Sequence, residues 1–403
     1  MVSSRRKRTR LQQIPIMTLP MTTFITQRAQ QTITINGERY TASEAKISAS
    51  DGKSLLQKKF YDLYGKDSFY SSLADFLAEW FDDSNTLKVH TSGSTGQPKE
   101  LWVEKRKMMN SAILTISFLK LHQGDSAMLC MPLQYIAGKM VVVRSLVAGL
   151  NLIPIPPCGH PMQNIETPPV FSAMIPMQVF NSLQVPSERK LLMQIQHLII
   201  GGGAIDDALG KALQEFPHAV WSTYGMTETL SHIALRRLNG SDHSDWYTPF
   251  DNVSLSLSEE NTLIIHAPSV CSELLRTNDI AEFNQHGLFR ILGRKDNTIN
   301  TGGVKVQIEQ VEKELKPLLD CPFMITSVPD PKFGERIVLL IEAVHINHEQ
   351  INESIKKLPP YRRPKQIIRI DTLPLTDTGK PSRAVARQIA SNYIDNLNSA
   401  TLL

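Results

Sequence analysis

The chain contains 403 residues, of which 41% are hydrophobic and 20% are charged, as in an ordinary globular protein long enough for two or three domains. The net charge is +4, and five of the first ten residues are basic, so the remainder of the chain is close to neutral. This balance argues against a nucleic-acid partner and against a membrane surface. The four cysteines are far apart and form no C-x-x-C pair, so we expect a cytoplasmic protein without a zinc site or a disulfide framework.

Residues 1–25 are predicted to form a disordered basic extension. No continuous apolar core follows its basic run, so the segment does not fit a signal peptide. The longest apolar stretch, residues 140–157, is interrupted by Arg144, Asn151 and several prolines. We therefore expect no stable membrane insertion.

The first predicted elements lead toward a loop rich in glycine and hydroxyl side chains. Residues 32–41 read as a hairpin, because an Asn-Gly pair divides two β-type runs. Apolar side chains from Leu73 to Trp80 recur at helical spacing. Residues 86–90 then form a short predicted strand, and residues 105–121 a helix.

Strands and helices alternate in the following part of the chain. Residues 127–132, 152–155, 170–175 and 197–200 are short apolar runs, and residues 138–150 form a helix between the first two. Such alternation predicts a layered α/β sheet with parallel strands. Ligands of these sheets bind beyond the carboxyl ends of the strands, where we place both glycine-rich stretches of the chain.

The pattern changes near residue 249. Residues 253–257 alternate with period two and turn into a second strand at 262–265, which predicts a small antiparallel β subdomain. A glycine and charged residues at 293–297 mark a domain boundary. The predicted fold is therefore a large N-terminal α/β domain (26–293) with a β subdomain, followed by a smaller α+β domain (294–403). In that last domain we expect helices at 308–315 and 348–357 and strands at 323–328, 337–344 and 366–370.

The glycine- and hydroxyl-rich loop at residues 91–99 has the chemistry of a polyphosphate-binding loop. Its glycines let backbone N–H groups approach an anion, its hydroxyls donate, and its lysine adds a mobile charge. It is not the P-loop pattern, because two residues separate the lysine from the second glycine. An ordinary surface loop has a similar composition. The residues concerned are Thr91, Ser92, Gly93, Ser94, Thr95, Gly96 and Lys99.

A second glycine cluster, Gly201 to Gly203, directly follows a predicted strand. Further along, residues 224–229 place an aromatic ring, hydroxyls and the carboxylate of Glu228 at one strand end. A ring for a purine and a carboxylate for Mg²⁺ form a coherent pair, although a tight turn explains the same residues. Asp279 ends another predicted strand and could hold vicinal hydroxyls or simply form a turn.

Taken together, these motifs resemble the acyl-adenylate-forming superfamily of acyl-CoA synthetases, adenylation domains and luciferases. The details are most similar to the o-succinylbenzoate–CoA ligases of menaquinone biosynthesis. Six stretches match in the family order, namely residues 91–99, 224–229, 275–279, 293–299, 301–306 and 373–383.

The resemblance implies that Mg-ATP activates a carboxylic acid as an acyl-adenylate and that coenzyme A then takes the acyl group. It implies phosphate binding by the loop at 91–99, with Thr95 and Lys99 catalytic, and Lys380 reaching the forming acyl-phosphate bond. Asp296 would be the hinge of the C-terminal domain. The remaining implied nucleotide, metal and coenzyme A residues are Gly201, Gly202, Gly203, Tyr224, Gly225, Thr227, Glu228 (Mg²⁺), Asp279, Arg294, Gly302 and Gly303.

The acid pocket is less defined. Tyr135 replaces the histidine that often gates this pocket in the family. A diacid would require a cation for its second carboxylate, and we consider Lys139, Arg144, His232 and Arg236 for this role, each of which also fits a surface or helix-face charge. Two alternatives stay open: an adenylating enzyme that loads another acid or a carrier protein, and a catalytically inactive nucleotide-binding protein. The oligomeric state is open between monomer and homodimer.

Overall fold

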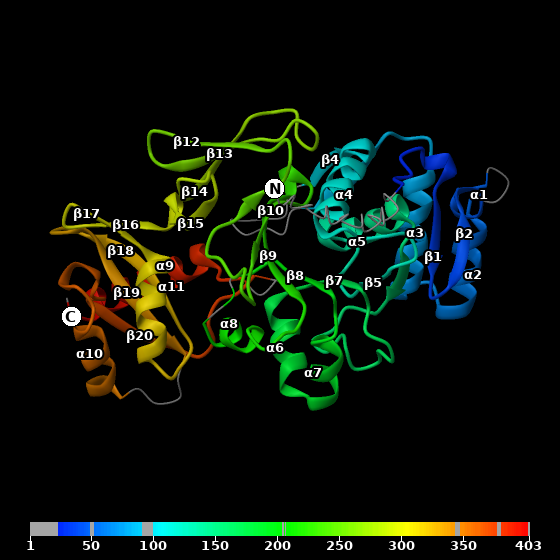
Figure 1. The fold of residues 1–403 in the computed structure, drawn as a ribbon. Helices are drawn as coiled ribbons and strands as arrows, with labels where there is room; N and C mark the ends of the chain where they lie inside the picture. The colour runs from blue at the N-terminus through cyan, green and yellow to red at the C-terminus, as the bar shows by residue number, and fades with distance from the viewer. Residues whose placement is uncertain are drawn as a thin grey trace, which may run out of the picture.

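The computed structural model describes residues 23–48, 52–90, 100–203, 205, 207–342, 347–376 and 380–401. Most of the basic extension and the whole loop at 91–99 lie outside these residues. The described residues form three larger sheets and a two-stranded ribbon, with the N-terminal helices at one end of the molecule and the C-terminal sheet at the other (Figure 1). No helix among the described residues is both long and apolar enough to cross a membrane.

The large sheet has nine strands in the order β11-β10-β9-β8-β7-β5-β6-β1-β2. Its middle, from β9 to β1, is parallel, and antiparallel strands close both edges. Burial on both faces explains the continuous apolar runs of the middle strands, such as the fully buried β7. The strands are β1 (Thr32–Ile35), β2 (Glu38–Thr41), β5 (Ser126–Leu129), β6 (Asn151–Pro154), β7 (Phe171–Met174), β8 (His197–Ile200), β9 (Ala219–Gly225), β10 (His232–Arg237) and β11 (Thr248–Pro249).

Helices cover this sheet because their apolar faces need burial. Every residue from Gly138 to Ala148 in α5 is buried, so α5 is enclosed on all sides, and it packs against α4. Gly138 is required where α5 begins, because a side chain there would lie 2.5 Å from the carbonyl oxygen of Pro132. The helices of this part are α1 (Ala42–Ala45), α2 (Leu55–Tyr64), α3 (Phe69–Phe81), α4 (Lys105–Leu119), α5 (Ile136–Ala148), α6 (Pro176–Gln184), α7 (Pro186–Leu192) and α8 (Asp207–Leu213).

The strand before the loop at 91–99 does not belong to the large sheet. β3 (Thr86–His90) pairs with β4 (Glu100–Glu104) in a separate antiparallel ribbon. Our expectation that both glycine-rich stretches follow strands of the parallel sheet is therefore wrong for the first stretch and right for Gly201, which follows β8. The burial pattern of β3 explains why it is not a strand of the parallel sheet. Leu87 and Val89 are fully buried while Lys88 is partly exposed, and this alternation is typical of a strand with one buried face.

The predicted β subdomain is a four-stranded antiparallel sheet. It consists of β12 (Ser254–Leu257), β13 (Thr262–His266), β14 (Leu275–Phe283) and β15 (Phe289–Arg294). Asp279 lies inside β14 and does not end a strand, which corrects the sequence-based expectation. It faces Arg294 directly across the β14–β15 pair.

The C-terminal part forms its own sheet with helices against it, and the predicted α/β class with this α+β part is confirmed. The predicted helix at 308–315 has the observed bounds, whereas the last helix was not predicted. Short buried side chains, Ala386 and Ala390, let that helix approach the sheet closely. The division into domains stays a prediction. The elements are β16 (Thr298–Thr301), β17 (Val304–Gln307), α9 (Ile308–Leu315), β18 (Phe323–Asp330), β19 (Gly334–Glu342), α10 (His348–Lys356), β20 (Gln366–Ile370) and α11 (Arg383–Thr401).

Candidate nucleotide and acid site

The second glycine cluster lies at the carboxyl end of β8, beside β9. A side chain at Gly201 would come within 2.4 Å of the hydroxyl oxygen of Thr223, so only glycine fits there. Gly202 has φ of +79°, a left-handed conformation that favours glycine. At this end of the parallel sheet the backbone therefore carries no side chains, and a ligand that binds there can approach it closely.

Tyr224 and Asp279 join the large sheet to the β subdomain. The Tyr224 hydroxyl donates to Oδ2 of Asp279 at 2.6 Å, and the Tyr224 ring meets Phe289 edge to face at 5.2 Å. Burial raises the pKa of Tyr224, and the negative charge of Asp279 adds to this effect. The tyrosine therefore stays protonated and donates to Asp279 at the junction of the two sheets.

Arg294 connects Asp279 with Asp296. Its Nη1 donates to Asp279 Oδ1 at 3.2 Å, while Nε and Nη2 donate to the two oxygens of Asp296 at 2.9 and 2.7 Å. Hydrogen bonding to Asp296 raises the pKa of Arg294. Burial opposes ionisation of Asp296, but the hydrogen bonds from Arg294 prevail and lower the pKa of Asp296. Asp279 and the predicted hinge residue Asp296 thus share the guanidinium of Arg294.

Lys380 comes from the far end of the chain to the same region. Its backbone N–H donates to the Thr376 hydroxyl at 3.1 Å, and its carbonyl accepts from the Thr376 N–H at 2.7 Å. Burial lowers the pKa of Lys380, and the positive charge of Arg294 lowers it further. The Thr-Gly-Lys sequence of this turn predicts an exposed lysine head, and that prediction is wrong, because the side chain is partly buried close to the Arg294 network.

The motif after β9 contains Glu228 in a single helical turn, Thr227–Thr229. The Glu228 side chain is exposed and has no hydrogen-bond or ion-pair partner among the described residues. Within the same described residues no group of three or more His, Cys, Asp or Glu could hold a metal. Mg²⁺ needs no such group when it takes one carboxylate and phosphate oxygens, and a free carboxylate fits that donor set.

Gly225 brings this motif against the start of β10. A side chain on Gly225 would lie 2.3 Å from the carbonyl oxygen of Ser231 and 2.5 Å from Cα of His232, so glycine is required. Gly225 and His232 are also register partners in the β9–β10 pair. Any group bound beside Ser231 and His232 therefore lies at the end of the β9–β10 pair, whose connecting turn contains Glu228.

Arg144 is the most unusual charge in this region. It lies on α5, is 2% exposed, and its Nη2 donates to the Ser231 hydroxyl at 2.7 Å. Its buried Nε has no hydrogen-bond partner, and no carboxylate pairs with it among the described residues. Burial lowers the pKa of Arg144 to about 9. A buried cation without a counter-ion is costly, so a ligand anion would be strongly favoured here.

His232 and Thr115 extend this cluster, which we call the Arg144 cluster (Arg144, Ser231, His232 and Thr115). His232 Nδ1 lies 3.2 Å from the Ser231 hydroxyl, and Nε2 lies 3.1 Å from the Thr115 hydroxyl. Burial lowers the pKa of His232 far below its usual range, and the charge of Arg144 acts in the same direction. The imidazole is therefore neutral.

The other two candidate cations already have partners. The Lys139 ammonium donates to the backbone carbonyl of Lys88 at 3.0 Å and lies 3.6 Å from a Glu79 carboxylate oxygen. Arg236 pairs with Asp245 and stacks over the ring of Tyr247. Both cations hold elements together, and neither joins the Arg144 cluster. Tyr135 precedes α5 as its N-terminal flanking residue.

Gly302 and Gly303 form the two-residue turn between β16 and β17, with φ of +60° and +80°. This turn belongs to the C-terminal sheet, and the Gly302 N–H donates to the carbonyl of Phe333 at 2.8 Å. Both glycines are needed, because a hairpin turn of this length uses left-handed residues. The structure does not bring them together with the other predicted site residues through any described hydrogen bond.

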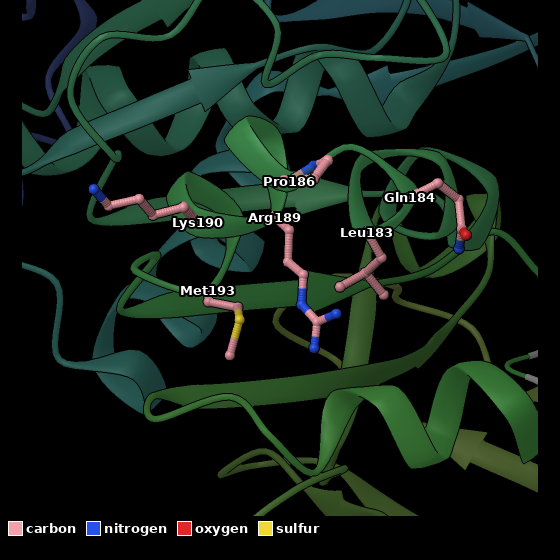
Figure 2. A pocket seen from close by; sticks show the side chains of 6 residues that line it. All are labelled: Leu183, Gln184, Pro186, Arg189, Lys190 and Met193. Atoms are coloured by element: carbon pink, nitrogen blue, oxygen red, sulfur yellow. The ribbon is translucent and has the colours of Figure 1, made fainter.

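A shallow hollow lies elsewhere, between α6 and α7, and Figure 2 shows its lining. The lining residues are Leu183, Gln184, Pro186, Arg189, Lys190 and Met193. None of the predicted site residues is among them. The Arg189 side chain is paired with Glu215 and Lys190 is exposed, so neither cation is buried as Arg144 is.

Comparison with known proteins adds the family. A model of the AMP-binding enzyme family matches residues 28–268. The chain belongs to the AMP-binding enzyme family. It is an acyl-adenylate-forming ligase, as its motifs predict.

Individual relatives agree with this membership. A 2-succinylbenzoate–CoA ligase of Listeria monocytogenes serovar 1/2a is 24% identical over 82% of this chain and 77% of its own. An acyl-CoA synthetase (AMP-forming)/AMP-acid ligase II-like protein from Dyadobacter fermentans has 28% identity and a TM-score of 0.56, over 79% of this chain and 94% of its own. The fold also resembles O-succinylbenzoate coenzyme A synthetase (MenE) from Bacillus subtilis in complex with ATP and magnesium ion. That likeness has a TM-score of 0.61 and 19% identity, over 74% of this chain and 68% of the other.

In this AMP-binding enzyme the sequence analysis did not single out Ser231 and Thr115, which complete the Arg144 cluster. Ser231 lies two residues after the 224–229 motif, so its place in the chain was a usable signal. Thr115 lies in the middle of α4, 117 residues before His232, and gave no such signal. The phosphate-loop residues (Thr91, Ser92, Gly93, Ser94, Thr95, Gly96 and Lys99) lie outside the described residues.

Proposed function

We propose that this ligase uses Mg-ATP to adenylate an aromatic diacid, o-succinylbenzoate, and then transfers the acyl group to coenzyme A. The names of the relatives point to this substrate, and identity near one quarter leaves it to be tested. A diacid presents one carboxylate for activation and one for recognition. The second needs a cation that is buried, unpaired and near the nucleotide motif.

Arg144 is the observation that supports this proposal. His232 is neutral, and of the remaining three candidates Lys139 and Arg236 have carboxylate partners, whereas Arg144 has none in the described part of the chain. It reaches Ser231, and Ser231 touches Gly225 of the nucleotide motif. A carboxylate bound to Arg144, directly or through one water, would offset the cost of burying that charge, and a mono-acid would leave the cost in place.

The nucleotide half of the proposal rests on other residues. Asp279 would accept from the ribose hydroxyls, with Tyr224 and Arg294 holding its carboxylate in place. Glu228 would hold Mg²⁺, which supplies charge neutralisation to the phosphates. Gly201 and its neighbours would face the adenine.

Lys380 would stabilise negative charge as the acid attacks the α-phosphate. Its position near Arg294 supports a role in this first step. Gly302 and Gly303 lie at a separate turn of the C-terminal sheet, and we propose that rotation about Asp296 brings this turn to the site for the second step.

The test is pyrophosphate release with o-succinylbenzoate and with the mono-acids that lack one carboxylate or the other. We expect release with the diacid to exceed that with either mono-acid by about 10³-fold or more, because a mono-acid leaves a buried charge unpaired. Thioester formation is then followed after adding coenzyme A. Equal turnover of benzoates or medium-chain fatty acids would reject this substrate, and transfer only to a pantetheinylated carrier protein would favour the alternative acceptor.

A further inference from the structure

In the Arg144 cluster each hydrogen bond can be assigned a donor and an acceptor. We assign the Thr115 hydroxyl proton to the carbonyl of Ser111 one helical turn earlier, at 3.4 Å, and with this assignment the Thr115 oxygen accepts from His232 Nε2 at 3.1 Å. The proton of the neutral imidazole is therefore on Nε2, and Nδ1 is an acceptor. Ser231 accepts from Arg144 Nη2, and its own proton is free to go to Nδ1.

This direction has a consequence for Arg144. Donation by Ser231 to His232 turns the serine lone pairs toward Arg144, so the serine holds one nitrogen of the guanidinium and leaves Nε without a partner. The Thr229 hydroxyl fixes Ser231 from the other side, donating to the Ser231 carbonyl at 2.7 Å. The guanidinium is held in one orientation by groups that carry no negative charge.

The packing around His232 keeps the ring in place. His232 is 6% exposed, its ring lies 5.4 Å from the Phe250 ring in an edge-to-face contact, and its backbone pairs with Gly225. A carboxylate in the place of His232 would pair with Arg144 and remove the need for a ligand. A neutral acceptor holds the cation without satisfying its charge.

We propose that His232 is a positioning residue that sets the preference for diacids, by directing the Ser231 hydroxyl and thereby holding the Arg144 guanidinium ready for the second carboxylate. This inference rests on the proposed function, because it assumes that Arg144 receives that carboxylate. His232 itself touches neither the substrate nor the nucleotide. Its contribution is therefore to selectivity between acids and not to the adenylation step.

Two matched variants test whether the Ser231 hydroxyl needs an acceptor at the position of His232 Nδ1. In His232→Asn the side-chain oxygen takes the place of Nδ1, and His232→Leu has a similar size with no acceptor. We expect His232→Leu to lower kcat/KM for the diacid by about 10-fold, the scale of one hydrogen bond in a charged network, with the mono-acid rate unchanged. His232→Asn should recover most of the diacid rate. Thermal unfolding of both variants shows whether each is folded.

The Arg144→Met background separates positioning from general damage. If His232 acts through Arg144, His232→Leu has no further effect on the diacid rate in that background. Equal losses for diacid and mono-acid, no recovery in His232→Asn, or a loss that persists with Arg144→Met would overturn the inference. A wild-type enzyme without diacid preference rejects the proposed function instead, whereas a preference that survives in His232→Leu rejects only the role of His232.

Discussion

Two arginines of this ligase have opposite surroundings. Arg294 donates to two carboxylates, Asp279 and Asp296, and is partly exposed. Arg144 is 2% exposed, and in the described part of the chain its guanidinium donates to the uncharged hydroxyl of Ser231. Burial alone lowers the pKa of Arg144, while hydrogen bonding raises the pKa of Arg294.

The difference indicates what each arginine needs. Arg294 has its counter-charges within the chain and orients both of them, Asp279 at the proposed ribose position and Asp296 at the predicted hinge. Arg144 lacks a counter-charge in the described part of the chain, so binding of an anion would be the event that completes its surroundings. A ligand carboxylate should therefore matter much more to Arg144 than to Arg294.

The largest expected effect comes from removing the unpaired cation. Arg144→Met should lower diacid adenylation by about 10³-fold, because the second carboxylate would lose its buried partner, while the mono-acid rate stays within a few-fold. Arg144→Lys is the matched control, since it keeps the charge but loses the planar fork, and should fall between wild type and Arg144→Met. Steady-state pyrophosphate release with both acids measures this. Parallel losses with both acids would place Arg144 in the scaffold.

Lys380 should have the next largest effect, confined to one half-reaction. Lys380→Ala should slow acyl-adenylate formation by about 10²-fold, because it removes charge stabilisation from the first step. Thioester formation from supplied acyl-adenylate should be nearly normal. Single-turnover assays of each half-reaction test this, with exposed Lys365→Ala as the control. Equal losses in both half-reactions would contradict a division of labour between them.

Asp279 should affect the nucleotide and leave the choice of acid unchanged. Asp279→Asn keeps the shape but removes the charge that Tyr224 and Arg294 hold, so KM for ATP should rise by about 10-fold. The control is Glu282→Gln on the same strand, where the carboxylate pairs with Arg290. Initial rates over a range of ATP concentrations give the value. A change in the ratio of the diacid rate to the mono-acid rate would show that the sites around Arg294 and Arg144 are not independent.

The smallest effect is on stability, and it has a defined pH dependence. Arg144→Met should raise the free energy of unfolding by about 1 kcal/mol at neutral pH without ligand, because a buried unpaired charge is lost. Between pH about 9 and the usual arginine value of 12.5, the unfolded wild-type chain binds more protons than the folded one. The free energy of unfolding of the wild type therefore rises with pH in this window relative to that of Arg144→Met. The difference between the two proteins becomes smaller as a result.

Urea unfolding of both proteins at pH about 7 and about 10 measures that difference. A variant less stable than wild type at neutral pH would mean that Arg144 contributes more through packing than it costs through its charge.

Local patterns of the sequence were sufficient for most elements. The hairpin at 32–41, with its Asn-Gly turn, and the helix at 308–315 were predicted with their observed bounds, because their signals lie within a few residues of each other. The helix at Arg383–Thr401 was missed, because its buried contacts are with strands β18 and β19 far away in the chain. The place of β3 in a separate ribbon also depended on its partner strand.

For the site, the sequence determined which chemistry was available. The motifs predicted Tyr224, Glu228, Asp279, Arg294 and Lys380 as nucleotide residues, because each occurs in a recognisable local pattern. The sequence could not distinguish Lys139, Arg144 and Arg236, because a cation looks the same in a sequence whether or not it is paired. Folding decided this, by giving Lys139 and Arg236 carboxylate partners and burying Arg144 without one in the described part of the chain. The cost of a buried charge depends on neighbours from distant segments, so only the tertiary structure could show which arginine is buried without a counter-charge among those residues.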